Sequence, residues 1–319
     1  MKIRIKLSHE KWDTSLTGKG KFILRLIPEL KKLGCEITDD INEPVDVDFQ
    51  ISRWHYKPTK CKKTVLRIGP AHVDSAKNHK WLNSRKAKAI KRADGVIFQS
   101  KFGRKMVKNF IAKPKGLSTV ILNGAPVGEY KNGGTEEAAH VYNFLASTRI
   151  WKKQKRLMHI KKGFLEACIP SSCLWIAGDD NRQPGEERFD NDICIKRIGP
   201  CDDNMLLDLY TTCDALIHMV WLDCCPNQVV EALAGGCKVI CNNAAGTKEL
   251  VEPSGGIVLD TEKKWNKQPV KTECPPTASK ELIAWGLKEI LKKDPPKTDH
   301  IDIKNIAKQY YDFFRKVLG

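Results

Sequence analysis

Apolar residues recur along this chain in short runs, each flanked by polar or turn-forming residues. Apolar runs of about four to eight residues are typical of strands buried in a sheet. In the first half we expect strands at KIRIKL (2–7), CEIT (35–38), VDVDFQIS (45–52), TVLRIG (64–69), GVIFQS (95–100) and TVILNG (119–124). In the second half we expect them at VYNFLAS (141–147), LWIAGDD (174–180), CIKRIGP (194–200), ALIHMV (215–220) and KVICNN (238–243).

Amphipathic stretches separate these runs. SLTGKGKFILRLIPELKKLG (15–34) predicts a helix that Gly18 and Gly20 precede and that Gly34 ends. Further helices are expected at 202–213, 279–293 and 303–319. Strands that alternate with helices indicate parallel α/β sheets, and a length of 319 residues favours two domains over one.

The segment DCCPNQVVEALAGG (223–236) lies between two of the predicted strands and reads as a turn that runs into a buried helix. Such a turn sits at the carboxyl end of a strand, where open α/β sheets bind their ligands. Pro226 has no N–H and fixes its own φ. The amides of Asn227, Gln228 and Val229 would then form the free first turn of a helix, a site for anions or sugar hydroxyls.

Two acids frame this segment, because Glu231 stands eight positions after Asp223. Asp223 would lie on the loop, and Glu231 on a helix whose other residues are apolar or small. A carboxylate in that setting needs a hydroxyl or a cation as a partner. Each acid also has a structural alternative, Asp223 as a helix cap and Glu231 as the partner of a nearby base.

The stretch from Ile198 to Asp260 resembles the donor-binding half of retaining GT-B glycosyltransferases that carry two acids separated by seven residues (glycosyltransferase family 4-like, glycosyl transferases group 1). The resemblance implies an α/β GT-B fold, with two Rossmann-like domains facing each other across a cleft. It implies that Glu231 holds the ribose hydroxyls of a nucleotide sugar and that Asp223 lies beside the donor sugar. This chain has Asp at 223 where the family usually has Glu, so that carboxylate is one methylene shorter.

The same resemblance assigns cations and nucleotide contacts. Lys155 fits the family's lysine that reaches the donor diphosphate, while Arg149 and Lys152 compete for the position of its arginine partner. Cations there would stabilise the negative charge of the leaving nucleotide, although a solvated basic patch is the alternative. The family's nucleotide base lies near the loops after two C-domain strands, which makes Gly178 and Arg197 candidate contacts.

The first half contributes candidates of its own. In the family, the glycine-rich turn that holds Gly18 and Gly20 here faces the cleft. RIGPAHVDSA (67–76) follows a predicted strand and puts His72 and Asp74 at the carboxyl edge. His72 is a candidate base or acceptor contact, and a loop histidine without a role in the reaction is the alternative.

Charge is unevenly distributed along the chain. Residues 1–125 hold 28 Lys and Arg against 11 Asp and Glu, while the remainder holds 27 of each, so the whole formal net charge of +17 belongs to the first half. Residues 75–115 hold 13 bases and one acid, Asp94. A solvated face is the usual reading of a charge run, but a field this concentrated favours a polyanion or an anionic membrane surface as partner.

Cysteine pattern and hydropathy exclude several classes of protein. The twelve cysteines show no paired Cys-x-x-Cys spacing, so we interpret them as buried free thiols rather than as metal ligands or disulfides. There is no apolar run near 18 residues and no signal peptide, so we expect a soluble, cytoplasmic protein. No Asp-x-Asp stands in the segments expected to line the cleft, and we expect no cofactor and no metal requirement.

With the linker placed at 127–139, the resemblance implies an acceptor-binding domain at 1–126, a nucleotide-sugar-binding domain at 140–300 and a helix at 301–319 that packs back on the first domain. The expected reaction is transfer of a sugar, with retention, from a nucleotide-diphosphate donor to an anionic acceptor. The acceptor is expected to be a phosphorylated or lipid-linked glycan; the hydroxymethylated bases of DNA, as in viral enzymes, are the alternative. A non-catalytic binding protein on a GT-B scaffold is a third interpretation.

Overall fold

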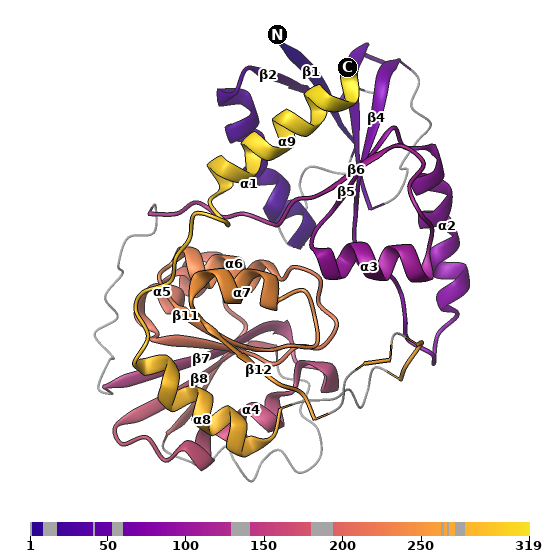
Figure 1. Cartoon of the computed structure of the whole chain (residues 1–319). Coiled ribbons are helices and arrows are strands. Elements are labelled where there is room, and N and C mark those ends of the chain that lie inside the picture. The colour runs from indigo at the N-terminus through magenta and orange to yellow at the C-terminus, as the bar shows by residue number, and fades with distance from the viewer. Residues whose placement is uncertain are drawn as a thin grey trace. The chain divides into compact units, whose positions relative to one another are not determined.

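The computed structural model describes residues 2–8, 18–40, 42–52, 60–128, 141–179, 194–262, 265–266, 268–271 and 278–319. They form two compact units, each built around a six-stranded sheet (Figure 1). Unit 1 consists of Met1–Pro126, Lys267–Val270 and Asp299–Gly319, and unit 2 of Val127–Asn266 and Lys271–Thr298. The α/β class expected from the sequence is confirmed.

Unit 1 is a parallel sheet in the order β2-β1-β3-β4-β5-β6. Its strands are β1 (Ile3–Ser8), β2 (Cys35–Thr38), β3 (Val45–Ile51), β4 (Cys61–Ile68), β5 (Gly95–Phe98) and β6 (Leu117–Val120). Its helices are α1 (Gly18–Lys32), α2 (His79–Arg92), α3 (Lys101–Phe110) and α9 (Ile303–Leu318). The strand order reverses between β1 and β3, which makes the carboxyl ends of these two strands the switch point of this sheet.

Local sequence explains where the helices of unit 1 begin and end. The side chain of Asn78 accepts a hydrogen bond from the Trp81 amide at 3.0 Å and caps α2, and Gly34 follows α1 with a φ of +89°. One expectation was wrong: α1 begins at Gly18, so Gly18 and Gly20 lie within its first turn rather than before it.

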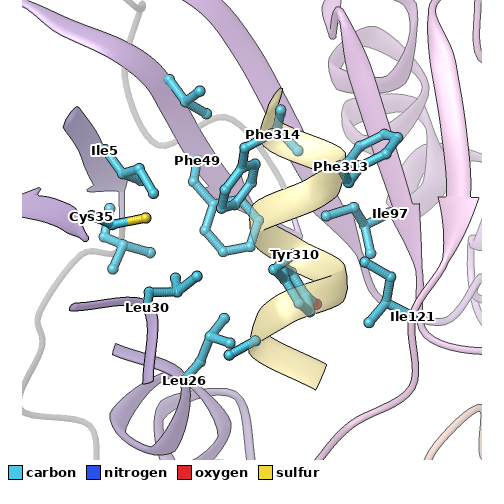
Figure 2. Packing of buried hydrophobic residues seen from close by; sticks show 14 of the residues in the cluster. Ile5, Leu26, Leu30, Cys35, Phe49, Ile97, Ile121, Tyr310, Phe313 and Phe314 are labelled. Atoms are coloured by element: carbon cyan, nitrogen blue, oxygen red, sulfur yellow. The ribbon is translucent and has the colours of Figure 1, made fainter. Parts of the chain in front are cut away.

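Helix α9 is part of the core of unit 1 (Figure 2). Tyr310 and Phe314 are fully buried, and their rings lie 5.7 and 5.4 Å from the ring of Phe49 on β3. The guanidinium of Arg67 on β4 is also buried, donates from Nε to the Tyr310 hydroxyl at 3.1 Å and lies 4.3 Å from the ring centre of Phe22. The last helix of the chain thus completes the face of the sheet that α1 also covers.

Unit 2 is a parallel sheet in the order β12-β11-β10-β7-β8-β9. Its strands are β7 (Tyr142–Ile150), β8 (Ser172–Asp179), β9 (Ile195–Gly199), β10 (Ala215–His218), β11 (Lys238–Asn242) and β12 (Ile257–Leu259). Its helices are η1 (Lys153–Lys155), α4 (Leu157–Ala167), α5 (Asp203–Thr212), α6 (Asn227–Ala234), α7 (Lys248–Ser254) and α8 (Lys280–Leu291). Helices α4 and α8 cover one face of this sheet and α5, α6 and α7 the other (Figure 1).

Two segments of the range predicted for the second domain, Lys267–Val270 and residues 299–300, belong to unit 1. The amide of Val270 donates to the carbonyl of Val73 at 3.0 Å, and the amide of Ser75 donates to the carbonyl of Val270 at 2.9 Å. This short bridge attaches residues from within the predicted second domain to unit 1. Of the predicted linker 127–139, residues 129–139 lie outside the described residues.

The cysteines of the described chain are free thiols, and seven of them are buried. The buried ones are Cys35, Cys173, Cys213, Cys224, Cys225, Cys237 and Cys241. Burial raises the pKa of Cys35 and Cys173 to about 11 and that of Cys213 to about 12, so these thiols stay protonated at neutral pH. The interpretation of buried thiols therefore holds for these seven, whereas Cys61, Cys194 and Cys201 are half-buried and Cys168 is exposed.

Candidate functional site

The strand order of unit 2 reverses between β7 and β10, which pair with Ala215 opposite Phe144. The chain leaves these two neighbouring strands toward opposite faces of the sheet, and the crevice at such a switch point is where open α/β sheets bind ligands. Lys155 lies on the loop after β7, and the segment 223–236 follows β10. The sequence therefore brings the expected diphosphate lysine and the expected donor-binding turn to one edge of one sheet.

The turn after β10 is held by local hydrogen bonds. Leu222 has a φ of +59°, in the left-handed region, and so redirects the chain into the turn. The Asp223 carboxylate accepts from the amide of Cys225 at 3.3 Å, and the Asp223 carbonyl accepts from the amide of Gly246 at 2.9 Å. The second bond ties this turn to the loop after β11, and Asp223 itself is half-buried.

The first turn of α6 offers fewer free amides than the sequence predicted. Pro226 occupies the position before the helix without a side-chain cap. The amide of Val229 donates to the carbonyl of Pro226 at 3.2 Å, so the expectation that this amide is free was wrong: the turn closes with a bond from residue i to i−3. The amide of Gln228 has no acceptor among the described residues and remains available to a ligand.

Glu231 lies in α6 and is 6% exposed, between the buried residues Val230 and Ala232. The sequence expectation of a carboxylate on an apolar helix is therefore met in the structure. The vicinal hydroxyls of a ribose are hydrogen-bond donors of the kind that a carboxylate accepts.

The loop after β7 contacts the loop after β10. Lys155 ends the single turn η1, and the amide of Trp221 donates to the carbonyl of Gln154 at 3.4 Å. Lys155 is half-buried and close enough to His218 to lower the pKa of that imidazole. Arg149, near the end of β7, and Lys152, just before η1, are both exposed.

Gly178 and Arg197 were proposed as contacts to the nucleotide base, and the structure shows what surrounds each. Gly178 has a φ of +123°, and a Cβ there would come within 1.8 Å of the Thr148 carbonyl oxygen and 3.3 Å of the Trp151 indole nitrogen. The glycine is thus required by the close approach of β7 and β8. Arg197 is half-buried on β9, opposite Ile176.

In unit 1, His72 lies on the loop after β4. Asn83 of α2 is buried and holds this loop, because its side-chain oxygen accepts from the His72 amide at 2.9 Å and its nitrogen donates to the His72 carbonyl at 2.8 Å. Partial desolvation, followed by the charges of Lys86, Lys77 and Lys19, lowers the pKa of His72. The imidazole is therefore neutral at pH 7, as a general base must be.

His218, at the end of β10, is a candidate that the sequence analysis missed. Its side chain is 2% exposed, and burial, together with the charge of Lys155, lowers its pKa to about 3. Its Nδ1 lies 3.4 Å from the side-chain nitrogen of Gln228, and its Nε2 has no hydrogen-bond partner among the described residues. A polar residue inside the otherwise apolar run ALIHMV was the signal available in the sequence.

Thirteen bases of residues 75–115 form what we call the basic face, on and around α2 and α3. Eleven of them are exposed: Lys77, Lys80, Arg85, Lys88, Lys91, Arg92, Lys101, Lys105, Lys108, Lys113 and Lys115. The exposed large apolar residue in this range is Trp81, whose ring lies 5.2 Å from the Arg85 guanidinium. The described residues contain no cluster of three potential metal-ligating side chains.

No helix in the described parts of the chain has the length and hydropathy to cross a bilayer. No family model and no curated protein matches the sequence. Solved structures do match. A sucrose-phosphate synthase from Thermosynechococcus elongatus has a TM-score of 0.64 at 13% identity and covers 99% of both chains.

Two further structures agree with that match. A glycosyltransferase from Rickettsia africae has a TM-score of 0.60 at 13% identity, over 99% of this chain and 98% of its own. An α,α-trehalose-phosphate synthase from Burkholderia xenovorans, in complex with glucose-6-phosphate, has a TM-score of 0.60 at 12% identity, over 94% of this chain and 77% of its own. The chain therefore has the two-domain α/β fold of the GT-B glycosyltransferases.

Proposed function

We propose that this protein is a retaining glycosyltransferase that moves a sugar from a nucleotide-diphosphate donor to an anionic acceptor. The observation that carries the proposal is the buried carboxylate of Glu231 on α6, directly after a turn at the switch point of unit 2, with Lys155 on the neighbouring loop. A buried acid, the free amide of Gln228 and a cation at one sheet edge match the ribose, the sugar and the diphosphate of such a donor.

In this mechanism unit 2 binds the donor. Glu231 accepts hydrogen bonds from the ribose hydroxyls, and Asp223 lies beside the donor sugar. Lys155, with Arg149 or Lys152, receives the diphosphate, which gains negative charge as the bond from the anomeric carbon to the phosphate oxygen breaks. Gly178 and Arg197 lie toward the nucleotide base.

The acceptor hydroxyl attacks the anomeric carbon from the face that the diphosphate leaves, and its proton passes to a departing phosphate oxygen. The electron pair of the broken bond stays on the diphosphate, so no external base, oxidant or metal is required by the balance of the step. Unit 1 binds the acceptor in this proposal, with His72 and the first turn of α1, which holds Gly18 and Gly20, as its candidate contacts.

The charge of unit 1 supports an anionic acceptor. The trehalose-phosphate synthase with the same fold binds glucose-6-phosphate, a phosphorylated sugar. We infer a phosphorylated or lipid-linked glycan for this chain. DNA with hydroxymethylated bases is the second candidate, and the basic face favours it because Trp81 is its one large exposed apolar side chain among the described residues.

The proposal is tested by incubating the purified protein with a panel of UDP-, GDP- and ADP-sugars and measuring release of the nucleoside diphosphate. We expect slow hydrolysis of one donor by the wild type and a loss of about a hundredfold or more for Glu231→Ala. Glu252→Ala is the matched control, because Glu252 is an exposed glutamate of the neighbouring helix α7 and should keep wild-type activity.

A wild type that binds a nucleotide sugar but neither hydrolyses nor transfers it would support the non-catalytic alternative. Binding of no donor at all would overturn the proposal. Retention is tested on the product, because the anomeric proton coupling in its NMR spectrum must be that of the donor.

A further inference from the structure

The last residue of β10 and the loop after it carry two buried ring nitrogens that nothing in the described chain satisfies. One belongs to the imidazole of His218, whose Nε2 has no partner, and the other to the indole Nε1 of Trp221. The two side chains are 2% and 5% exposed. Leaving a buried donor unsatisfied is unfavourable, so two of them within four residues indicate a ligand that supplies acceptors.

The tautomer of His218 follows from its neighbour. The side-chain nitrogen of Gln228 lies 3.4 Å from Nδ1 and can only donate, so Nδ1 must accept. Burial and the charge of Lys155 keep the imidazole neutral, and a neutral imidazole carries one proton. That proton is therefore on Nε2, and His218 presents a donor, like Trp221.

Charge narrows the class of ligand. Lys155 is the positive charge whose field lowers the pKa of His218, so a group that accepts from Nε2 also lies within the field of a lysine. Donors without acceptors, beside a cation and at the switch point between β7 and β10, fit an oxyanion better than a sugar hydroxyl, which would itself need an acceptor.

We propose that the Nε2–H of His218 donates a hydrogen bond to a phosphate oxygen of the donor diphosphate, and that Gln228 is the positioning residue that keeps the proton on Nε2. The inference rests on the proposed function, because it names a further contact of the same donor site. The bond strengthens as the diphosphate gains charge, so His218 stabilises the leaving group along with Lys155.

The test measures binding of UDP, GDP, ADP and inorganic pyrophosphate to the full chain by calorimetry. His218→Phe keeps a ring but removes the donor, and we expect it to weaken binding of the best nucleoside diphosphate, and of pyrophosphate, about ten- to a hundredfold. His218→Gln restores a side-chain N–H and should recover part of that loss. His300→Phe, in unit 1, is the matched control and should bind like the wild type.

The tautomer is read independently from long-range ¹H–¹⁵N NMR spectra of the wild-type imidazole, with and without UDP. We expect a protonated Nε2 in the free protein and a shift of that resonance on binding. Gln228→Glu offers Nδ1 an acceptor instead of a donor, so it should move the proton to Nδ1 or charge the ring, a change that a purely structural glutamine would not produce.

Each outcome decides one point. If the wild type binds no nucleoside diphosphate, the proposed function fails together with this inference. If it binds one and His218→Phe binds it equally well, or if the free imidazole carries its proton on Nδ1, only the role of His218 is overturned. The NMR result holds even if His218→Phe does not fold.

Discussion

At the scale of single residues, burial identifies the candidate site more clearly than sequence position does. Glu231 and His218 are both polar and almost fully buried, at 6% and 2% exposure, although each stands in an apolar segment. Burial of a polar group is unfavourable unless a partner satisfies it. His218 ends β10 and Glu231 lies on the helix that follows it, so both polar groups are buried where the candidate site lies.

The neutral state of His218 predicts how stability depends on pH. In the unfolded chain its pKa is about 6.5, whereas in the folded protein it is about 3, so between these values the unfolded state binds one more proton. Stability therefore falls as the pH drops below about 6.5. The loss due to this residue alone is about 2 kcal/mol between pH 7 and pH 5.

Urea denaturation of the wild type and of His218→Gln at pH 7 and pH 5 measures this effect. Other histidines contribute equally to both proteins, so the difference between their pH slopes isolates position 218. We expect the variant to lose about 2 kcal/mol less than the wild type on acidification. Equal slopes would mean that His218 is accessible to protons in the folded state.

At the scale of elements, strands and helices were predictable, and the exceptions have identifiable causes. Apolar runs with turn residues on both sides located β10 and β11 within two residues of their observed ends. The pattern could not show that Gly18 begins α1, because glycine serves equally as a turn residue and in a first helical turn. Nor could it show that Val270 pairs with Val73, a contact between segments far apart in sequence.

Part of the candidate site could be proposed from the sequence. Asp223 and Glu231 were proposed from their spacing along one connection, and the structure has one on a turn and the other on the helix that follows. His218 was not found, because the sequence places it within an apparent buried strand and its importance depends on Gln228, ten residues later, and on Lys155, from another strand. Contacts across the sheet edge appear only in three dimensions.

Helix α9 offers a test of how one element is fixed to its sheet. Tyr310→Phe removes the acceptor of the Arg67 Nε–H, which is buried, and should lower the free energy of unfolding by about 1–3 kcal/mol. Adding Arg67→Met to the Tyr310→Phe variant removes the Nε–H donor that has lost its acceptor. Because the lost bond is shared, the double variant should be less destabilised than the sum of the two single variants.

Thermal and urea unfolding of the four proteins measures this coupling. Additive effects would show that the bond between β4 and α9 contributes nothing beyond packing. The unfolding transition to follow is that of unit 1, because both residues belong to that unit. Tryptophans of unit 2 report the unfolding of unit 2.

At the scale of the whole molecule, the excess positive charge and the candidate donor site belong to different units. The six-stranded sheet with the candidate donor site belongs to unit 2, whereas the basic face belongs entirely to unit 1. In the first 125 residues bases outnumber acids by 17, which is the whole net charge of the chain. A field confined to one unit attracts an anionic partner to that unit and leaves donor binding in the other unaffected.

Reversing charge on the basic face should therefore weaken binding of the acceptor and leave binding of the nucleotide sugar unchanged. Lys88 and Arg92 lie one turn apart on α2, are exposed and make no ion pair with any described residue. We expect Lys88→Glu with Arg92→Glu to raise the KM for the acceptor about tenfold or more at low salt, with the KM for the nucleotide sugar unchanged. Lys288→Glu with Lys293→Glu changes the charge of unit 2 by the same amount and serves as the control.

Binding to duplex DNA and to anionic vesicles, measured at several salt concentrations, distinguishes the two candidate acceptors. If the acceptor is DNA, the wild type binds duplex DNA with an affinity that falls steeply with salt, and the reversed variant shows a shallower slope because it contacts fewer phosphates. If the acceptor is a lipid-linked glycan, the wild type binds vesicles that contain anionic lipid and does not bind duplex DNA. A reversed variant that keeps the wild-type acceptor KM at every salt concentration would show that the basic face is only a solvated surface, because a charge change of four on the contacting helix cannot leave an electrostatic contact unaltered.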